Sequence, residues 1–225
     1  MEWWQILLIV LGSLLLLFVL SIIFYKPFFK RFWDIVLSFL AIVVLSPILM
    51  FLSIAGAIAM RGNPFFTQQR PGKKEKKFHL IKFRSMSNKK DENGNLLPDE
   101  KRLGKYGKIL RATSLDELPE LFNIFIGNMS IVGPRPLLVK YLPYYTEKEK
   151  HRHDVRPGLT GWAQINGRNF CDWDDRLRFD VEYVENVSFW FDIRIIFLTV
   201  FKVLKGSGVS EKRITPLDEE RKEKE

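Results

Sequence analysis

Apolar residues are concentrated in two long stretches near the N-terminus and in a third towards the C-terminus. Residues 3–25 carry no charge and consist mainly of Leu, Ile, Val and Phe. As a helix this stretch would be roughly 35 Å long, enough to cross a hydrocarbon core about 30 Å thick. No basic leader precedes it and no small-residue cleavage site follows it, which argues against a signal peptide. We therefore expect a retained transmembrane helix within residues 1–27.

The second apolar stretch covers about residues 32–60 and contains Ser46 and Pro47 near its middle. Proline removes one backbone donor and clashes with the preceding turn, so a helix should bend there. The Ser46 hydroxyl can bind the carbonyl that the proline frees, which matters where no water is available.

Basic residues flank this second stretch on both sides. They are Lys26, Lys30 and Arg31 before it, and Arg61, Arg70, Lys73, Lys74, Lys76 and Lys77 after it. Positive flanks prefer the cytoplasmic side, and a full span would place one of the two clusters outside. The pattern therefore favours a re-entrant membrane hairpin over residues 28–60, broken at Ser46 and Pro47. An ordinary span kinked at the proline is the alternative. The first helix would then start in the periplasm.

Residues 61–210 mix strand and helix signals. Residues 65–69 and 77–83 read as a strand pair joined by a Pro71-Gly72 turn, and residues 88–99 read as a polar loop. A helix is predicted from near Ser114 to Phe125, and another over residues 174–186, with a tight turn at Asn166-Gly167 between them. No glycine-rich nucleotide loop is present in the sequence. The predicted fold class is α+β: a small mixed catalytic domain beneath the membrane segments.

The third apolar stretch, residues 189–205, contains Asp192, Arg194, Lys202 and Lys205 among Phe, Ile, Leu and Val. This composition suits an amphipathic helix lying in the membrane interface, and a helix that closes the core is the alternative. Residues 211–225 are mostly charged and are expected to be disordered.

The composition indicates which classes of ligand the chain can bind. The 35 Lys and Arg against 26 Asp and Glu give a formal charge of +9, which favours phosphates, anionic lipids or nucleic acid as ligands. The single Cys171 excludes an internal disulfide and fits a reducing compartment.

The most informative chemistry lies in the run 113–121, Thr-Ser-Leu-Asp-Glu-Leu-Pro-Glu-Leu, which contains Asp116 and Glu117. Ser114 and Glu117 have the spacing of a helix capping box, so ordinary helix-start residues are one interpretation. Carboxylates that can attack or hold a metal, set beside rigid guanidinium groups, suit the transfer of a phosphorylated group. Adjacent helical side chains diverge by about 100°, which favours separate roles for the two carboxylates.

Two further blocks supply the guanidinium groups. In Gly133-Pro134-Arg135-Pro136 the prolines restrict the backbone and orient Arg135, whose planar group can hold phosphate. A structural turn with a solvated arginine is the alternative. The second block, residues 155–168, ends at Arg168.

At these residues the chain resembles the bacterial sugar transferases, also called monotopic phosphoglycosyl transferases. Several further blocks match in the same order, over residues 30–210: Ser46-Pro47, residues 65–72, Lys-Phe-Arg-Ser-Met at 82–86, Gly-Trp-Ala-Gln at 161–164 and residues 179–184. The most similar members begin protein glycosylation by transferring a bacillosamine-type sugar phosphate to undecaprenyl phosphate.

The resemblance implies a two-step reaction on a UDP-sugar and a polyprenyl phosphate at the cytoplasmic face of the bacterial inner membrane. It implies that Asp116 is the nucleophile and a Mg²⁺ ligand, with Glu117 as its catalytic partner. It also implies phosphate or nucleotide contacts for Lys82, Arg111, Arg135 and Arg168. Membrane lipid is an expected partner and nucleic acid is not. The sequence leaves open whether the chain forms a homo-oligomer, which sugar it uses, and what Asp180 and Tyr183 do.

The chain departs from the family pattern at Glu120, where many relatives carry glutamine, and at Asn128, where many carry aspartate. Two other functions stay open at this point. A basic, membrane-anchored protein that binds anionic lipid or nucleic acid would explain the charge but gives the Asp-Glu block no role. A metal-dependent phosphohydrolase would use the same acidic pair without a lipid acceptor.

Overall fold

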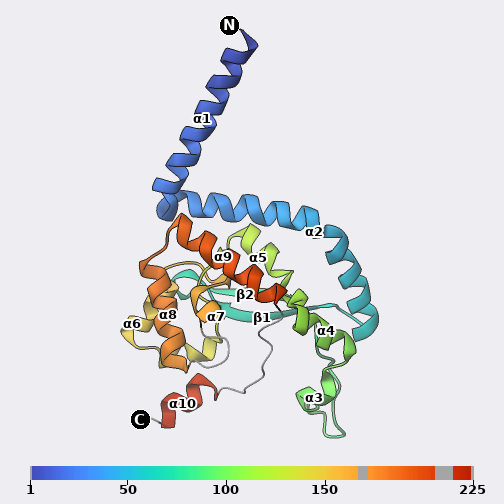
Figure 1. Ribbon diagram of the computed structural model, residues 1–225. Coiled ribbons are helices and arrows are strands. Elements are labelled where there is room, and N and C mark those ends of the chain that lie inside the picture. Colours follow the sequence, from blue (N-terminus) through green and yellow to red (C-terminus); the bar gives the residue numbers. More distant parts are fainter. Residues whose placement is uncertain (1, 167–171, 206–214, 224–225) are drawn as a thin grey trace.

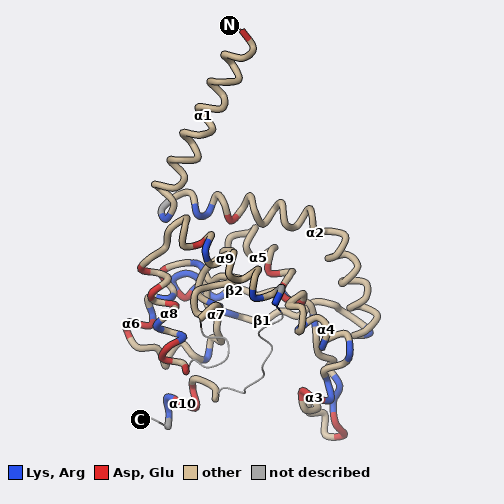
Figure 2. The backbone as a smooth tube through the Cα atoms, viewed as in Figure 1, with Lys and Arg blue, Asp and Glu red and all other residues tan. Residues whose placement is uncertain are grey.

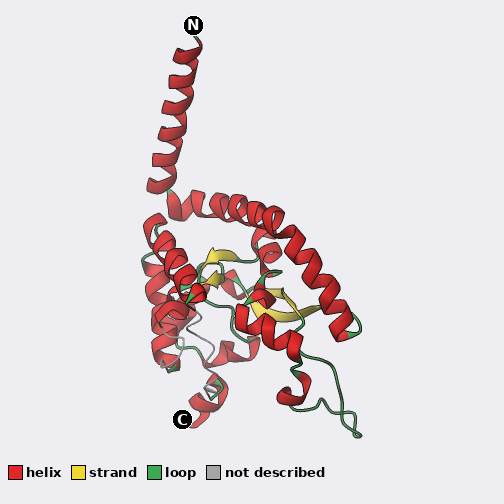
Figure 3. Cartoon of the chain, turned by 45° about the vertical axis from the view of Figure 1, so that its right-hand side comes forward, coloured by secondary structure: helices red, strands yellow, loops and turns green. Residues whose placement is uncertain are grey.

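The computed structural model describes residues 2–166, 172–205 and 215–223. Helices dominate over short strands, which confirms the predicted α+β class (Figures 1 and 3). The helices are α1 (Trp3–Ile23), α2 (Lys30–Met60), α3 (Asp99–Arg102), α4 (Lys105–Thr113), α5 (Glu120–Ile126), α6 (Glu147–Lys150), α7 (Trp162–Asn166), α8 (Trp173–Glu185), α9 (Phe189–Leu204) and α10 (Leu217–Glu223). The strands are β1 (Phe65–Pro71), β2 (Lys77–Phe83), β3 (Ser130–Val132) and β4 (Gly158–Thr160).

Helix α1 extends away from the rest of the molecule (Figure 1). Its apolar side chains are exposed along nearly the whole helix. The helix contains no Lys, Arg, Asp or Glu (Figure 2). Both α1 and α2 are long and apolar enough to cross a membrane. Such a surface cannot face water over this length without a large free-energy cost, so α1 requires an apolar environment.

Helix α2 is continuous over its whole length, with Pro47 inside it, and it bends midway (Figures 1 and 3). The predicted break at Ser46 and Pro47 is therefore a bend within one helix. Pro47 cannot donate to the Val43 carbonyl, and the Ser46 hydroxyl donates to that carbonyl instead, at 2.8 Å. This side-chain bond occupies the carbonyl that Pro47 leaves without an amide donor.

Helix α2 is hydrogen-bonded on both sides of its bend to the domain that follows it. Near its start, the buried Asp34 carboxylate accepts a hydrogen bond from the Ile131 amide at 3.0 Å. Towards its end, the Tyr106 hydroxyl of α4 donates to the Leu52 carbonyl at 2.9 Å. Both halves of α2 therefore contact the same domain.

The predicted strand pair is confirmed as an antiparallel ribbon of β1 and β2, in which Phe65 pairs with Phe83 and Pro71 with Lys77. The predicted Pro71-Gly72 turn is wrong in its position, because Pro71 is the last residue of β1 and the turn is formed by Lys73–Glu75. Asn123 on α5 fastens this ribbon, because its amide binds the backbone of both Ile81 (2.9 Å) and His79 (2.8 Å). Between α5 and the ribbon lies a core of buried apolar residues. They are Phe78, Leu80, Leu121, Ile124 and Met129.

The short strands β3 and β4 pair in parallel and bring two distant sequence blocks together. Their contact is backbone against backbone. A Cβ on Gly133 would lie 2.4 Å from the Arg156 carbonyl oxygen, and one on Gly161 would lie 2.2 Å from the Gly133 oxygen. Only glycine fits at both positions, so these residues fix the approach of the Gly-Pro-Arg-Pro block to the Gly-Trp-Ala-Gln block.

The C-terminal part of the chain matches some expectations and corrects one. The helix predicted over residues 174–186 is confirmed as α8. The Asn166-Gly167 turn reaches beyond the described residues. The expectation of a disordered tail is wrong for α10: its Leu217 is fully buried, and the Trp173 indole donates to the Thr215 carbonyl at 2.8 Å. A single leucine among charged residues was too weak a signal to predict this docking.

Candidate active site

A cavity of about 760 Å³ lies in the catalytic domain, between the β1–β2 ribbon, α4 and the helices α7, α8 and α9. Five of the predicted site residues line it together: Lys82, Arg111, Asp116, Glu117 and Arg135. The sixth, Arg168, lies outside the described residues. Residues separated by more than fifty positions in the sequence thus meet in one site.

The backbone around Asp116 differs from the prediction of a helix starting at Ser114. Ser114 ends α4 in a left-handed conformation with φ 56°, its side chain makes no capping bond, and residues 115–117 form a 3-10 turn. The capping-box interpretation is therefore wrong. Pro119 contributes to the difference: it has no amide proton to donate to the Leu115 carbonyl, which instead accepts from the Leu118 amide at 3.3 Å in the 3-10 turn. Helix α5 begins only after it.

Glu117 is committed to two cations. One of its carboxylate oxygens accepts from the Lys82 ammonium at 2.7 Å and from the Arg135 guanidinium at 2.6 Å. Burial alone would raise the pKa of Glu117, but the two positive charges outweigh it and hold this pKa below its ordinary value. Glu117 therefore stays ionised and holds the Lys82 and Arg135 side chains in place.

Glu120 is a site residue that the sequence did not identify as one. It is buried, and its carboxylate lies 3.0 Å from the Lys82 ammonium. Burial raises the pKa of Glu120 above its ordinary value, and the neighbouring Glu117 charge adds to this, against the opposing effect of Lys82. Its departure from the glutamine of many relatives was the only sequence signal.

Asp116 stands apart from this network. Among the described residues its carboxylate makes no ion pair and no hydrogen bond to another side chain, although it lines the cavity. Burial and the adjacent Glu117 charge raise its pKa above the ordinary aspartate value, and Lys82 and Arg111 oppose this. A partly desolvated carboxylate without a bonded partner is suited to attack an electrophile or to bind a metal. The two adjacent acids thus have separate environments, and their separate roles remain a prediction.

Arg135 is positioned through its backbone as well as its side chain. Its carbonyl accepts from the Arg152 guanidinium at 2.8 Å. Arg152 is in turn held by Asp180 at 2.7 Å, and the two side chains are only 1% and 5% exposed. This buried pair gives Asp180 a role that the sequence left open: Asp180 holds Arg152, and Arg152 in turn holds the Arg135 carbonyl. Nothing in the sequence indicated Arg152.

Tyr183 lies in a second buried cluster, at the junction with the membrane helices. Its hydroxyl is 2.8 Å from Asp192 of α9. Asp192 also accepts from the Tyr25 hydroxyl at 2.6 Å and forms an ion pair with Lys30. Tyr183 therefore joins α8, α9 and the start of α2, and its role is structural.

Positive charge dominates the cavity. Its lining includes eight lysines and arginines against the three acids Asp116, Glu117 and Asp180. Besides Lys82, Arg111 and Arg135, the basic residues are Arg70, Arg84, Arg102, Arg176 and Lys202. Since two of the three acids are already paired with cations, the cavity carries an excess of positive charge that suits a diphosphate.

The side chains of the cavity can be compared with the ligands that Mg²⁺ prefers. Within the described residues, no group of three or more His, Cys, Asp or Glu side chains could hold a metal ion by itself. Mg²⁺ does not need one, because it is commonly bound by one or two carboxylates together with substrate phosphates and waters. The unpaired Asp116 carboxylate fits this mode, whereas Glu117 is occupied by Lys82 and Arg135.

Comparison with known proteins adds to this geometry. Residues 25–206 match the family model described as "Bacterial sugar transferase". The chain is 50% identical over 183 residues to "Uncharacterized sugar transferase EpsL" of Bacillus subtilis (strain 168), covering 81% of this chain and 90% of that protein.

Other relatives have more specific names. The chain is 44% identical over 185 residues to "UDP-glucose:undecaprenyl-phosphate glucose-1-phosphate transferase" of Escherichia coli (strain K12), covering 77% of this chain and 39% of that protein. It is 34% identical over 193 residues to "UDP-N-acetylgalactosamine-undecaprenyl-phosphate N-acetylgalactosaminephosphotransferase" of Aeromonas hydrophila, covering 80% of this chain and 45% of that protein. The chain thus spans less than half the length of these two relatives, and their names specify different sugars.

Proposed function

Since the chain belongs to the bacterial sugar transferase family and is a phosphoglycosyl transferase, we propose that it transfers a sugar 1-phosphate from a UDP-sugar to polyprenyl phosphate, releasing UMP. The observation that carries this proposal is the Asp116 carboxylate, which lines a strongly basic cavity without a cation of its own. Undecaprenyl phosphate is the acceptor named for the relatives, and the sugar is open because those names differ.

In the first step, a carboxylate oxygen of Asp116 attacks the phosphorus atom that carries the sugar. A bond forms between this oxygen and phosphorus, the bond from phosphorus to the bridging oxygen of the diphosphate breaks, and UMP leaves with the electron pair. Arg135 and Lys82, held by Glu117, stabilise the negative charge on the phosphoryl oxygens. Asp116 would be the side chain that holds Mg²⁺, and the charge neutralisation that such an ion supplies would favour departure of UMP.

In the second step, an oxygen of the polyprenyl phosphate attacks the same phosphorus atom. The bond to Asp116 breaks, its carboxylate is regenerated, and a polyprenyl diphosphate sugar is formed. No net proton transfer is required, because a phosphate oxygen replaces a carboxylate oxygen. Asp116 is the nucleophile in the first step and the leaving group in the second, so one carboxylate serves both steps.

The proposed membrane arrangement has α1 crossing the inner membrane and α2 re-entering the cytoplasmic leaflet. It is supported by the contacts that tie both parts of the bent α2 to the same domain, through Asp34 and Tyr106. A straight span would have to break one of these contacts. The catalytic domain then lies at the cytoplasmic face, where a soluble nucleotide sugar and a lipid phosphate can both reach the cavity.

Cysteine labelling tests this topology. In a background with Cys171 replaced, cysteines at the exposed Phe28 and Gly62, just outside the two ends of α2, should both resist periplasmic thiol reagents in whole cells. Both should react in inverted membrane vesicles, which shows that lipid does not shield them. A cysteine at Glu2 should react in whole cells and serves as the control for periplasmic access. Labelling of either end of α2 from the periplasm would contradict the re-entrant arrangement.

The reaction itself is tested by incubating the purified protein with a panel of UDP-sugars, with and without undecaprenyl phosphate. We expect continuous UMP release with the correct sugar only when the lipid is present. A phosphohydrolase would turn over without lipid, and a lipid-binding protein would release no UMP with any sugar. Either result would overturn the proposal.

A further inference from the structure

Helix α9 connects the membrane helices to the cavity. At its start, the Phe189 ring packs edge-on against Phe18 of α1 at 5.9 Å and against Tyr25 at 5.6 Å, between ring centroids. In its last turn, Lys202 and Val203 line the cavity that contains Asp116. One element therefore runs from the membrane junction to the reacting carboxylate.

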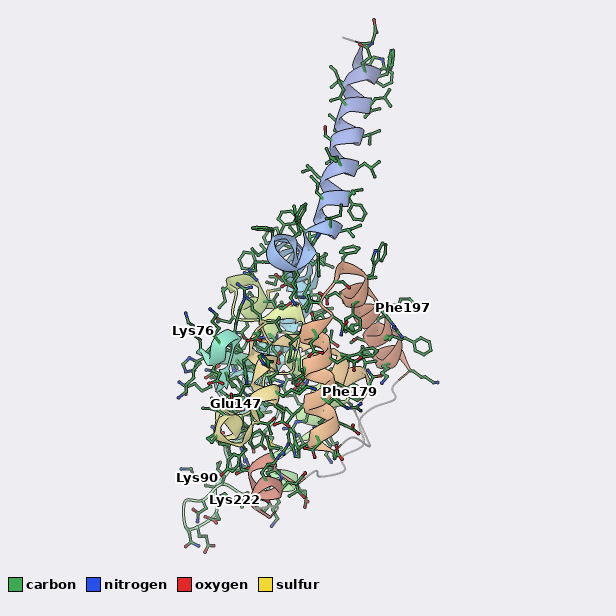
Figure 4. The ribbon with its side chains drawn as sticks, turned by 90° about the vertical axis from the view of Figure 1, so that its left-hand side faces the viewer. Lys76, Lys90, Glu147, Phe179, Phe197 and Lys222 are labelled. Carbon is green, nitrogen blue, oxygen red and sulfur yellow. The ribbon has the colours of Figure 1, made fainter. Side chains whose placement is uncertain are left out.

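The outer face of α9 is apolar along this path. Its large exposed side chains recur every three or four positions: Trp190, Ile193, Phe197, Val200 and Phe201. Phe197 is 70% exposed and points away from the body of the protein (Figure 4). A face of this kind is stable only against an apolar phase, so α9 lies where lipid can approach it.

Lys202 differs from the other basic residues of α9. It is half-buried, lines the cavity, and its ammonium group contacts the Ile165 carbonyl of α7. Lys205, one turn later, lies over the Phe201 ring at 5.9 Å and is not part of the cavity lining. Arg194 lies over the Trp162 ring. Among the described residues, Lys202 is thus the one cation that α9 contributes to the cavity.

Building on the proposed function, we propose that Lys202 binds the phosphate of the polyprenyl acceptor and that the acceptor reaches Asp116 along the α9 side of the cavity. An acceptor embedded in lipid must present its phosphate at a wall continuous with the membrane-facing surface, and α9 provides that wall. A charged phosphate is a stronger acceptor for an ammonium group than a neutral carbonyl such as that of Ile165. Lys82, Arg111 and Arg135 are built on other elements and remain available for the donor diphosphate.

Measuring the two half-reactions separately distinguishes a role in binding the acceptor from a role in both steps. In Lys202→Ala, reconstituted as the full chain in lipid nanodiscs, the burst of UMP from the UDP-sugar without acceptor should keep its rate and amplitude. The kcat/KM for undecaprenyl phosphate should fall by about tenfold or more, because a charge-assisted bond to the acceptor is lost. Lys202→Arg should retain most of this value.

Lys205→Ala is the matched control, since it removes the same charge from the same helix outside the cavity, and it should behave as wild type. An equal loss in the UMP burst and in lipid transfer would place Lys202 at the donor site and overturn the proposal. An unchanged kcat/KM for the lipid would overturn it as well. Failure of the proposed function is distinguishable, because the wild-type protein itself would then show no lipid-dependent UMP release.

Discussion

Asp116→Asn should abolish turnover and prevent formation of any covalent intermediate. The amide is nearly the same size as the carboxylate but lacks the negative oxygen that attacks phosphorus, so the loss should be at least about a thousandfold in kcat. Incubation of the wild-type protein with UDP-sugar and Mg²⁺, without lipid, should release a near-stoichiometric burst of UMP and then stop. Intact-protein mass spectrometry should detect a sugar-phosphate adduct that disappears when undecaprenyl phosphate is added.

Two variants serve as comparisons. Asp154→Asn makes the same change at an exposed residue that does not line the cavity, and it should leave the burst unchanged. Glu117→Gln keeps the nucleophile but weakens the hold on Lys82 and Arg135, so slow adduct formation should survive. Substantial turnover by Asp116→Asn would reduce Asp116 to a structural residue and remove the basis of the two-step mechanism.

The burst should also depend on pH in a defined direction. Only the ionised Asp116 carboxylate can attack, and burial raises the pKa of this group. As the pH is lowered, the burst rate should therefore begin to fall at a higher pH than an ordinary aspartate would give. Rapid-quench measurement of UMP release across the acid range follows this loss.

Local patterns predicted the elements whose signals are local. The strand pair of β1 and β2 follows from two strand-like runs on either side of a Pro-Gly signal, although the turn itself lies at Lys73–Glu75. The contact of the Ser46 hydroxyl follows from the position of Pro47. Lys82, Arg111, Asp116, Glu117 and Arg135 were assigned by resemblance, and the structure brings all five into one cavity.

The predictions failed where the local structure or the role of a residue depends on distant or competing interactions. The helix expected from Ser114 fails because Pro119 interrupts the hydrogen-bond ladder, a local signal that outweighs the capping-box spacing. The docking of α10 depends on Trp173 and the core around it, more than forty residues away in sequence. The role of Asp180 depends on Arg152, which no motif contains.

The buried pair of Arg152 and Asp180 gives the largest expected effect on stability. In Asp180→Ala the Arg152 guanidinium stays buried without its counter-charge, so the free energy of unfolding should fall by about 3–5 kcal/mol. Lipid-dependent transfer should also fall, because Arg152 no longer holds the Arg135 carbonyl in place. Denaturant unfolding in detergent and UMP release measure the two effects.

Asp175→Ala is the matched control on the same helix. Asp175 pairs with Arg178, but the two side chains are 44% and 64% exposed, so this change should cost about 0.5 kcal/mol or less and leave activity intact. The double variant Arg152→Met with Asp180→Leu separates stability from positioning. Replacing both charges by apolar groups of similar size should recover most of the lost stability. Transfer should nevertheless stay low, because the Arg135 carbonyl still lacks its donor.

Full recovery of transfer in the double variant would show that the pair of Arg152 and Asp180 serves stability alone. Arg135 would then be oriented by its flanking prolines and by Glu117.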